Sequence, residues 1–172
     1  MCEHLGAPAQ WGGGHIHARL ADVGIVIPVN VDERDIGRDA DRSRGFAVQT
    51  TPYRAPEVLW GDARFGPAVD VWSLGIVLAG MAGHAFTSRC MPHADVEETL
   101  FRHRGVPATA SLRSLPWFPI ADAVQKGLAR QLLEPTTGRK WPAALTAKLG
   151  TAGVSLLNRC LAYEARLRPA VS

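Results

Sequence analysis

Cysteine and lysine are both scarce in this chain of 172 residues. Its three cysteines are far apart in the sequence, which argues against a disulfide framework or a paired-cysteine zinc site. They favour a reducing, intracellular compartment, either the cytoplasm or the nucleus. With only three lysines, and with basic residues that form no cluster, the formal net charge of +3 predicts neither a nucleic-acid partner nor a membrane-surface partner.

Long apolar runs are also absent. The longest, residues 71–83, is shorter than the roughly 18 residues that a membrane span needs. No basic region followed by an apolar run marks a secretory signal at the N-terminus. Because 47% of the residues are hydrophobic, the chain can build a core, and its length suits one domain.

The hydrophobic pattern predicts a mainly α chain with a short β segment near its N-terminus. Residues 1–14 have no pattern, residues 15–21 alternate as in a half-buried strand, and the mixed-charge stretch 32–44 is typical of a loop. Residues 68–83 are apolar on nearly every side, so we expect a helix surrounded by protein. Asp95 and Glu98 are spaced like a capping box that opens a helix over 95–104, and further helices are expected over 121–134 and 151–162.

Three sequence blocks carry a family resemblance. The blocks TTPYRAPE (50–57), DVWSLG (70–75) and RLRP (166–169) resemble the C-terminal lobe of a eukaryotic protein kinase in wording, order and spacing. The stretch LADVG (20–24) resembles the DFG turn, with Val23 in place of the phenylalanine. Tyr53-Arg54 and the stretch RGVP (104–107) resemble the CMGC branch, which holds the cyclin-dependent and MAP kinases.

The resemblance covers residues 15–172 and implies an activation segment over about 22–57 and a helical C-lobe over 58–172. The chain contains no Gly-rich loop, no strand lysine and no HRDxxxxN motif, so we expect the N-lobe to be absent and no catalytic set to be complete. The family uses ATP and Mg²⁺ to phosphorylate Ser or Thr of proteins. Binding of either cofactor by this chain alone is not expected.

The resemblance also assigns roles to single residues. Asp22 would be a vestigial magnesium ligand, although an Asp-x-Gly turn explains the same residues. Thr50 would contact the acceptor site, and Arg54 would shape the pocket for the residue after the acceptor. Glu57 and Arg168 would form an ion pair, in which a partly buried carboxylate obtains a bidentate partner.

Two further residues have competing explanations. By resemblance, Asp70 would hold the backbone of the catalytic loop; from the sequence alone, it is a first-turn carboxylate that satisfies free helix N–H groups. Ser43 is the only hydroxyl between Gly24 and Thr50, and arginines flank it on both sides. It is therefore a candidate phosphorylation site, although most serines in charged loops are unmodified.

Three functional hypotheses remain open at this point. The chain is the C-lobe part of a CMGC-like Ser/Thr kinase, or a non-catalytic pseudokinase module that binds a substrate or a cyclin-like regulator through residues 94–104 and the activation segment. The third is a decayed fragment without function. Each version without an N-lobe exposes apolar surface, which predicts self-association through the surface that faces the N-lobe in intact kinases.

Overall fold

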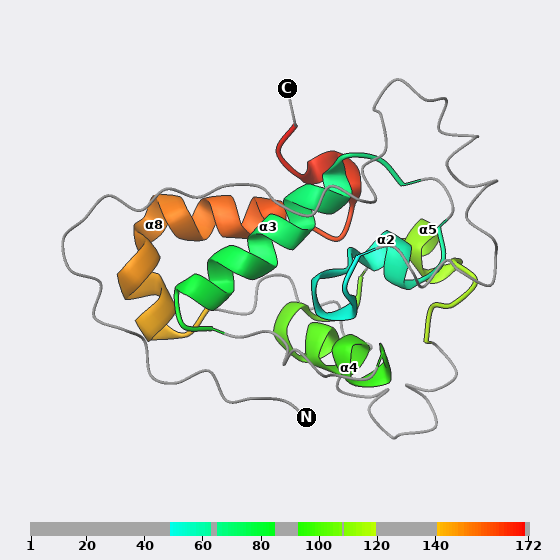
Figure 1. Ribbon diagram of the computed structural model, residues 1–172, viewed down its shortest axis with the longest axis horizontal. Coiled ribbons are helices and arrows are strands. Elements are labelled where there is room, and N and C mark those ends of the chain that lie inside the picture. Colours follow the sequence, from blue (N-terminus) through cyan, green and yellow to red (C-terminus); the bar gives the residue numbers. More distant parts are fainter. Residues whose placement is uncertain (1–48, 63–64, 85–92, 108, 120–140, 171–172) are drawn as a thin grey trace.

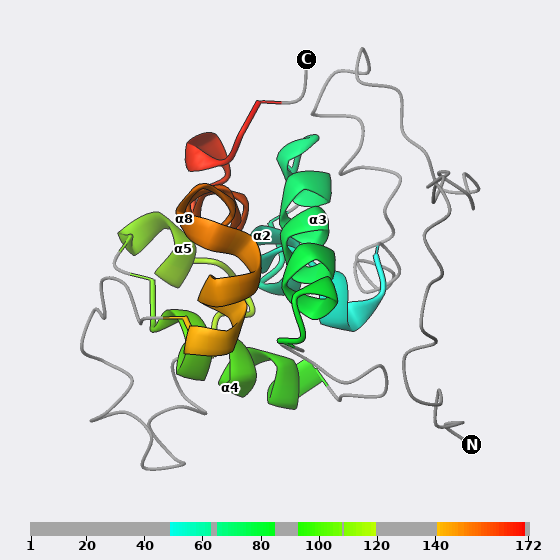
Figure 2. The same cartoon turned by 90° about the vertical axis from the view of Figure 1, so that its left-hand side faces the viewer.

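Helix α3 (Ala68–Met81) packs against three of the other described elements. The computed structural model describes residues 49–62, 65–84, 93–107, 109–119 and 141–170. In it, α3 contacts α8 (Ala143–Cys160) and the two short 3-10 helices, η1 (Thr51–Tyr53) and η2 (Ala165–Leu167). Helices α2 (Pro56–Leu59), α4 (His93–Arg104) and α5 (Ala110–Arg113) complete the described elements, and α8 lies beside α3 in both views (Figures 1 and 2).

The described part of the chain is helical and contains no strand. The strand expected over 15–21, the loop over 32–44 and the helix over 121–134 lie outside the described residues. Within the described ranges, no helix combines the length and the hydropathy needed to cross a membrane.

Helices α3 and α8 approach each other closely at Gly75. A Cβ atom at this position would lie 2.8 Å from Cδ2 of Leu161 and 2.9 Å from Cβ of Cys160, so only glycine permits the observed packing. Helix α8 bends at Gly150, whose φ of 63° is non-helical. Its second half therefore coincides with the helix expected over 151–162, and Leu157, Cys160 and Leu161 are buried as that pattern predicts.

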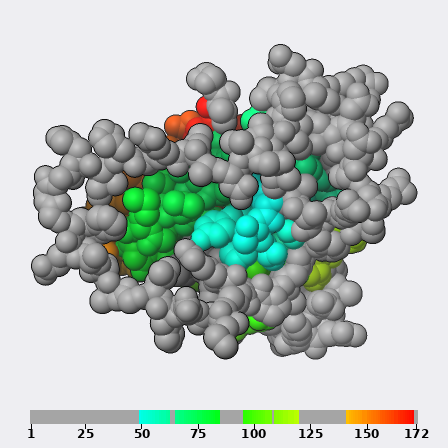
Figure 3. Space-filling view, viewed as in Figure 1, coloured from blue at the N-terminus to red at the C-terminus, as the bar shows by residue number. Residues whose placement is uncertain are grey.

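The outer face of α3 corrects the expectation of a helix enclosed on all sides. Leu74, Val77 and Met81 are 52%, 42% and 78% exposed, and their spacing places them in one stripe along the helix. The described elements pack against the opposite side, where Trp72 and Ile76 are buried. The sequence of α3 is apolar on both faces of the helix, so it could not show which face is covered by other elements. Figure 3 shows α3 open to the viewer beside the segment 49–62.

Two helix ends also differ from expectation. Helix α3 ends at Met81, because Gly83 takes a φ of 88° and the His84 N–H turns back to the Ala79 carbonyl at 2.9 Å. Helix α4 begins at His93, so Asp95 lies inside its first turn and the predicted capping box does not open the helix. The expected end of α4 is present, with Gly105 at a φ of 75°.

An aromatic cluster joins α2, α4 and the segment after α8. Trp60 is fully buried, with its ring centroid 4.8 Å from that of Phe118, 5.9 Å from that of Phe101 and 5.8 Å from that of Tyr163. Its indole N–H donates to the buried Glu97 carboxylate at 3.1 Å. The cluster therefore helps to fix the position of α2, which carries Glu57 in its first turn.

The close approach at Gly75 yields a paired prediction. Gly75→Ala should lower the free energy of unfolding by about 1–2 kcal/mol, because overpacking outweighs the gain in helix propensity. Gly80→Ala is the control: nothing lies within 4 Å of its added Cβ, so it should raise the free energy of unfolding by about 0.5–1 kcal/mol. Urea unfolding of both variants measures the difference, and equal effects would contradict the packing.

Candidate functional site: the segment 49–57 on helix α3

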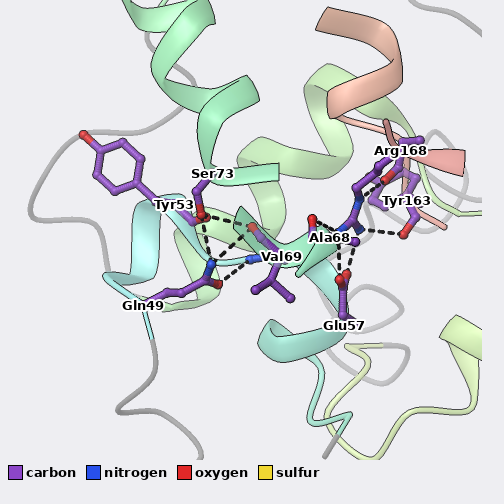
Figure 4. Close-up of polar contacts among 10 residues, drawn as sticks. Gln49, Tyr53, Glu57, Ala68, Val69, Ser73, Tyr163 and Arg168 are labelled. Atoms are coloured by element: carbon purple, nitrogen blue, oxygen red, sulfur yellow. Dashed lines mark hydrogen bonds and ion pairs between the residues drawn. The ribbon is translucent and has the colours of Figure 1, made fainter. Parts of the chain in front are cut away.

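A bidentate ion pair joins α2 to the C-terminal end of the described chain. Glu57 lies in the first turn of α2, and Arg168 follows η2, 111 residues later. Nη1 and Nη2 of Arg168 donate to the two carboxylate oxygens of Glu57, each at 2.7 Å (Figure 4). The pairing expected from the sequence is present, in the parallel two-bond geometry that makes such pairs strong.

Every N–H group of the Arg168 guanidinium has an acceptor. Nε donates to the Ala162 carbonyl at 2.9 Å, Nη1 also donates to the Ala68 carbonyl at 2.9 Å, and Nη2 also donates to the Tyr163 carbonyl at 3.0 Å. The guanidinium lies over the Trp72 ring, 5.2 Å from its centroid, and the side chain is fully buried. These hydrogen bonds offset most of the free-energy cost of removing the two charges from water. The pair also connects α2, the start of α3 and the chain after α8.

Thr50 and Arg54 flank η1 but differ in exposure. Thr50 is exposed, and its carbonyl accepts a hydrogen bond from the Tyr53 N–H at 2.8 Å. Arg54 is only 4% exposed, and its Nη2 donates to the Gln49 carbonyl at 2.9 Å. Burial lowers the pKa of the Arg54 guanidinium from its usual value, but arginine remains a cation in proteins. The two side chains thus belong to one short segment, one on its surface and one beneath it.

Asp70 lies at the surface in the first turn of α3. No hydrogen bond joins its carboxylate to another described side chain or N–H group. Its position fits the favourable interaction of an acidic side chain with a helix N-terminus, which needs no direct bond. Asp22 and Ser43 lie outside the described residues.

Three residues of this region were not found from the sequence: Gln49, Ser73 and Tyr163. Gln49 and Ser73 are hydrogen-bonded across 24 positions. Tyr163 donates from its hydroxyl to the Gly105 carbonyl at 2.5 Å, and its burial raises the pKa of the phenol well above the usual value. No local sequence pattern marked any of the three.

The described residues contain no group of three or more His, Cys, Asp or Glu side chains that could hold a metal ion. The described geometry is a short segment, residues 49–57, that hydrogen bonds and the Glu57–Arg168 pair hold against α3.

Comparisons with known proteins agree with this architecture. The model of the protein kinase domain matches residues 14–172. The chain therefore belongs to the protein kinase family, as its motifs indicated. It is 36% identical over 96 residues to "Cyclin-dependent kinase 12" of Drosophila melanogaster. Over 119 and 121 residues it is 32% and 35% identical to "Cell division control protein 2 homolog 1" and "homolog 2" of Trypanosoma brucei brucei. The similarity to cyclin-dependent kinases inferred from the sequence is thus confirmed.

The matches cover much more of this chain than of its relatives. They span 68% and 70% of this chain against 40% and 32% of the two trypanosomal proteins. For the Drosophila protein the shares are 54% and 7%. Activities of the whole relatives therefore apply to this chain only as proposals.

The buried ion pair gives the clearest stability prediction. Glu57→Ala or Arg168→Ala should cost about 3–5 kcal/mol, because each leaves a buried charge without its partner. The melting temperature should fall by several degrees in both. Arg166→Ala is the control, since Arg166 pairs with Glu164 at the surface with an 81% exposed side chain, and its melting temperature should not change. Calorimetry of the three variants decides, and an unchanged midpoint for either buried residue would contradict the pairing.

Proposed function

We propose that this chain supplies the protein-substrate platform of a Ser/Thr protein kinase of the cyclin-dependent type. The single observation that carries the proposal is the anchoring of segment 49–57 on α3 by the Glu57–Arg168 pair. In this proposal residues 15–172 are a partial kinase domain, with the activation segment over about 22–57 and the helical C-lobe over 58–172, and the N-lobe is not part of these residues.

Within the platform, Thr50 and Arg54 have different tasks. Thr50 is exposed, so its hydroxyl can contact a bound acceptor peptide. Arg54 is buried and donates a hydrogen bond to the Gln49 carbonyl. It therefore shapes the pocket for the peptide residue that follows the phosphate acceptor, without contacting the peptide itself. Asp70 supports the start of α3, against which this segment rests.

Phosphoryl transfer needs a phosphate and metal clamp and a base, besides the platform. Only Asp22 corresponds to a clamp residue, and no base of the HRDxxxxN type is present among the 172 residues. We therefore propose that these residues alone do not transfer a phosphoryl group and do not hold ATP and Mg²⁺ by themselves. A whole protein that contains them would transfer the ATP γ-phosphoryl group to Ser or Thr, with Ser43 as a candidate regulatory phosphorylation site.

The platform also implies a protein partner. The name of the Drosophila relative states dependence on a cyclin. A regulator of that kind would meet the surface formed by α4 and the activation segment, in an intracellular compartment. Helix α4 is suited to docking, because polar and charged side chains such as Glu98 and Arg102 lie on its exposed face.

The exposed stripe on α3 favours a second candidate, a kinase-like interaction module without catalysis. Leu74, Val77 and Met81 are spaced so that the stripe of one copy can pack antiparallel on the same stripe of another copy. Burial of three large apolar side chains per chain would drive such an association. We propose self-association of the chain through this stripe.

The platform is tested by peptide binding. Thr50→Val removes the hydroxyl while keeping the shape of the side chain, and it should weaken binding of the best peptide in an array of Ser- and Thr-centred peptides several-fold. Thr146→Val, on the exposed part of α8, is the matched control and should bind as the unmodified chain does. Fluorescence anisotropy measures both affinities. Equal affinity of the Thr50 variant and the control would show that the Thr50 hydroxyl does not contact the peptide. Absence of peptide binding by the unmodified chain would overturn the proposal.

The stripe is tested by light scattering. The unmodified chain should form dimers or larger species at high concentration, and Met81→Glu should shift it to the monomer, because a charge would then enter an apolar contact. Leu167→Glu is the control, since Leu167 is 56% exposed on η2, outside the stripe. A monomeric unmodified chain would contradict the proposal, as would equal shifts by both variants.

A further inference from the structure

Gln49 has a backbone conformation that is rare for its residue type. Its φ is 61°, in the left-handed region, and it is the one non-glycine with a positive φ in the described part of the chain. A side chain with a Cβ adopts this conformation at an energetic cost, so surrounding interactions must favour it. Both the side-chain amide and the backbone carbonyl of Gln49 take part in such interactions.

The Gln49 amide reaches both its own segment and α3. Its Oε1 accepts a hydrogen bond from the Ala55 N–H at 3.1 Å. Its Nε2 donates to the Val69 carbonyl at 3.2 Å and to the Ser73 hydroxyl at 3.0 Å (Figure 4). The orientation of the amide is determined by its partners, because a backbone N–H requires an oxygen and a backbone carbonyl requires an N–H donor.

Ser73 extends this contact to η1. Its hydroxyl accepts from Gln49 and donates to the Tyr53 carbonyl at 2.9 Å. At the other end of the same segment, Arg54 donates to the Gln49 carbonyl at 2.9 Å. The hydrogen bonds between residues 49–55 and α3 therefore involve Val69 and Ser73, in the first two turns of that helix. The partners of the Gln49 amide are two backbone groups and a hydroxyl, so these hydrogen bonds form without any charged or phosphorylated side chain.

We propose that Gln49 is a positioning residue for the substrate platform: its side-chain amide holds residues 50–55 on α3 in the conformation that receives the acceptor peptide. This inference rests on the proposed function of the same segment. Gln49 acts through Ala55, Ser73 and the Val69 carbonyl, and it need not touch the peptide. The Glu57–Arg168 pair anchors the C-terminal end of the segment, and Gln49 anchors its N-terminal end.

Two variants separate the side chain from the backbone. Gln49→Gly removes the amide but permits a positive φ, so it removes the hydrogen bonds without adding backbone strain. Gln49→Glu keeps an acceptor for the Ala55 N–H but places a carboxylate oxygen against the Val69 carbonyl, so it should retain only part of the effect. Ser73→Ala is a third variant, which removes the link to Tyr53 while leaving the Gln49 bond to Ala55.

Amide hydrogen exchange followed by NMR provides a readout that does not depend on peptide binding. In Gln49→Gly, exchange at the Ala55 N–H should accelerate about tenfold or more, because its acceptor is lost and the segment opens locally. Exchange in the second half of α8 should stay unchanged in the same sample. Unchanged exchange at Ala55 would overturn the proposal, and so would equal acceleration in α8, which would indicate a general loss of stability.

Peptide affinity provides the second readout. Gln49→Gly should weaken binding of the Ser- or Thr-centred peptide several-fold, with Gln49→Glu between it and the unmodified chain. Unchanged affinity despite faster Ala55 exchange would show that Gln49 holds the segment without positioning a substrate, and would overturn the proposal. If the unmodified chain binds no peptide, the proposed function fails and the positioning role fails with it, whereas the exchange result still decides whether the amide holds the segment.

Discussion

The buried contact between the Glu57 carboxylate and the Arg168 guanidinium is the interaction on which the rest of the structure depends. It joins positions 111 residues apart, and the same guanidinium also binds the Ala68 carbonyl at the start of α3. A guanidinium suits this position because its planar fork satisfies a carboxylate and several carbonyls together, which a lysine ammonium could not do with the same geometry. The aromatic cluster around Trp60 gives α2 further packing partners, and one of them, Tyr163, also accepts a hydrogen bond from Arg168.

The first turn of α3 serves as the common anchor for the segment 49–57. Two consecutive carbonyls of that turn, of Ala68 and Val69, accept hydrogen bonds from Arg168 and from Gln49. The segment between these anchors is short, and it carries the exposed Thr50. A kinase must present a protein substrate in a fixed position, since positioning contributes much of phosphoryl-transfer catalysis. The proposed substrate platform would therefore depend on contacts within the helical part of the chain.

The sequence predicted those features that a local pattern or a motif encodes. The Glu57–Arg168 pair followed from two motifs of the family, and the second half of α8 followed from its apolar spacing. The Gln49 contacts could not be predicted, because they need a positive φ at a non-glycine residue and a partner 24 positions away. The exposed face of α3 was missed for a different reason: hydrophobic periodicity reports which side chains avoid water, not which neighbours are present to cover them.

A double-mutant cycle between positions 57 and 168 tests the central claim most directly. The free energies of unfolding of Glu57→Ala, Arg168→Ala and the double variant are measured by urea denaturation against the unmodified chain. The structure predicts a coupling energy of about 2–3 kcal/mol, so that the double variant is much more stable than the sum of the single losses implies. Additive losses, within about 0.5 kcal/mol, would mean that the two side chains do not interact and would contradict the account.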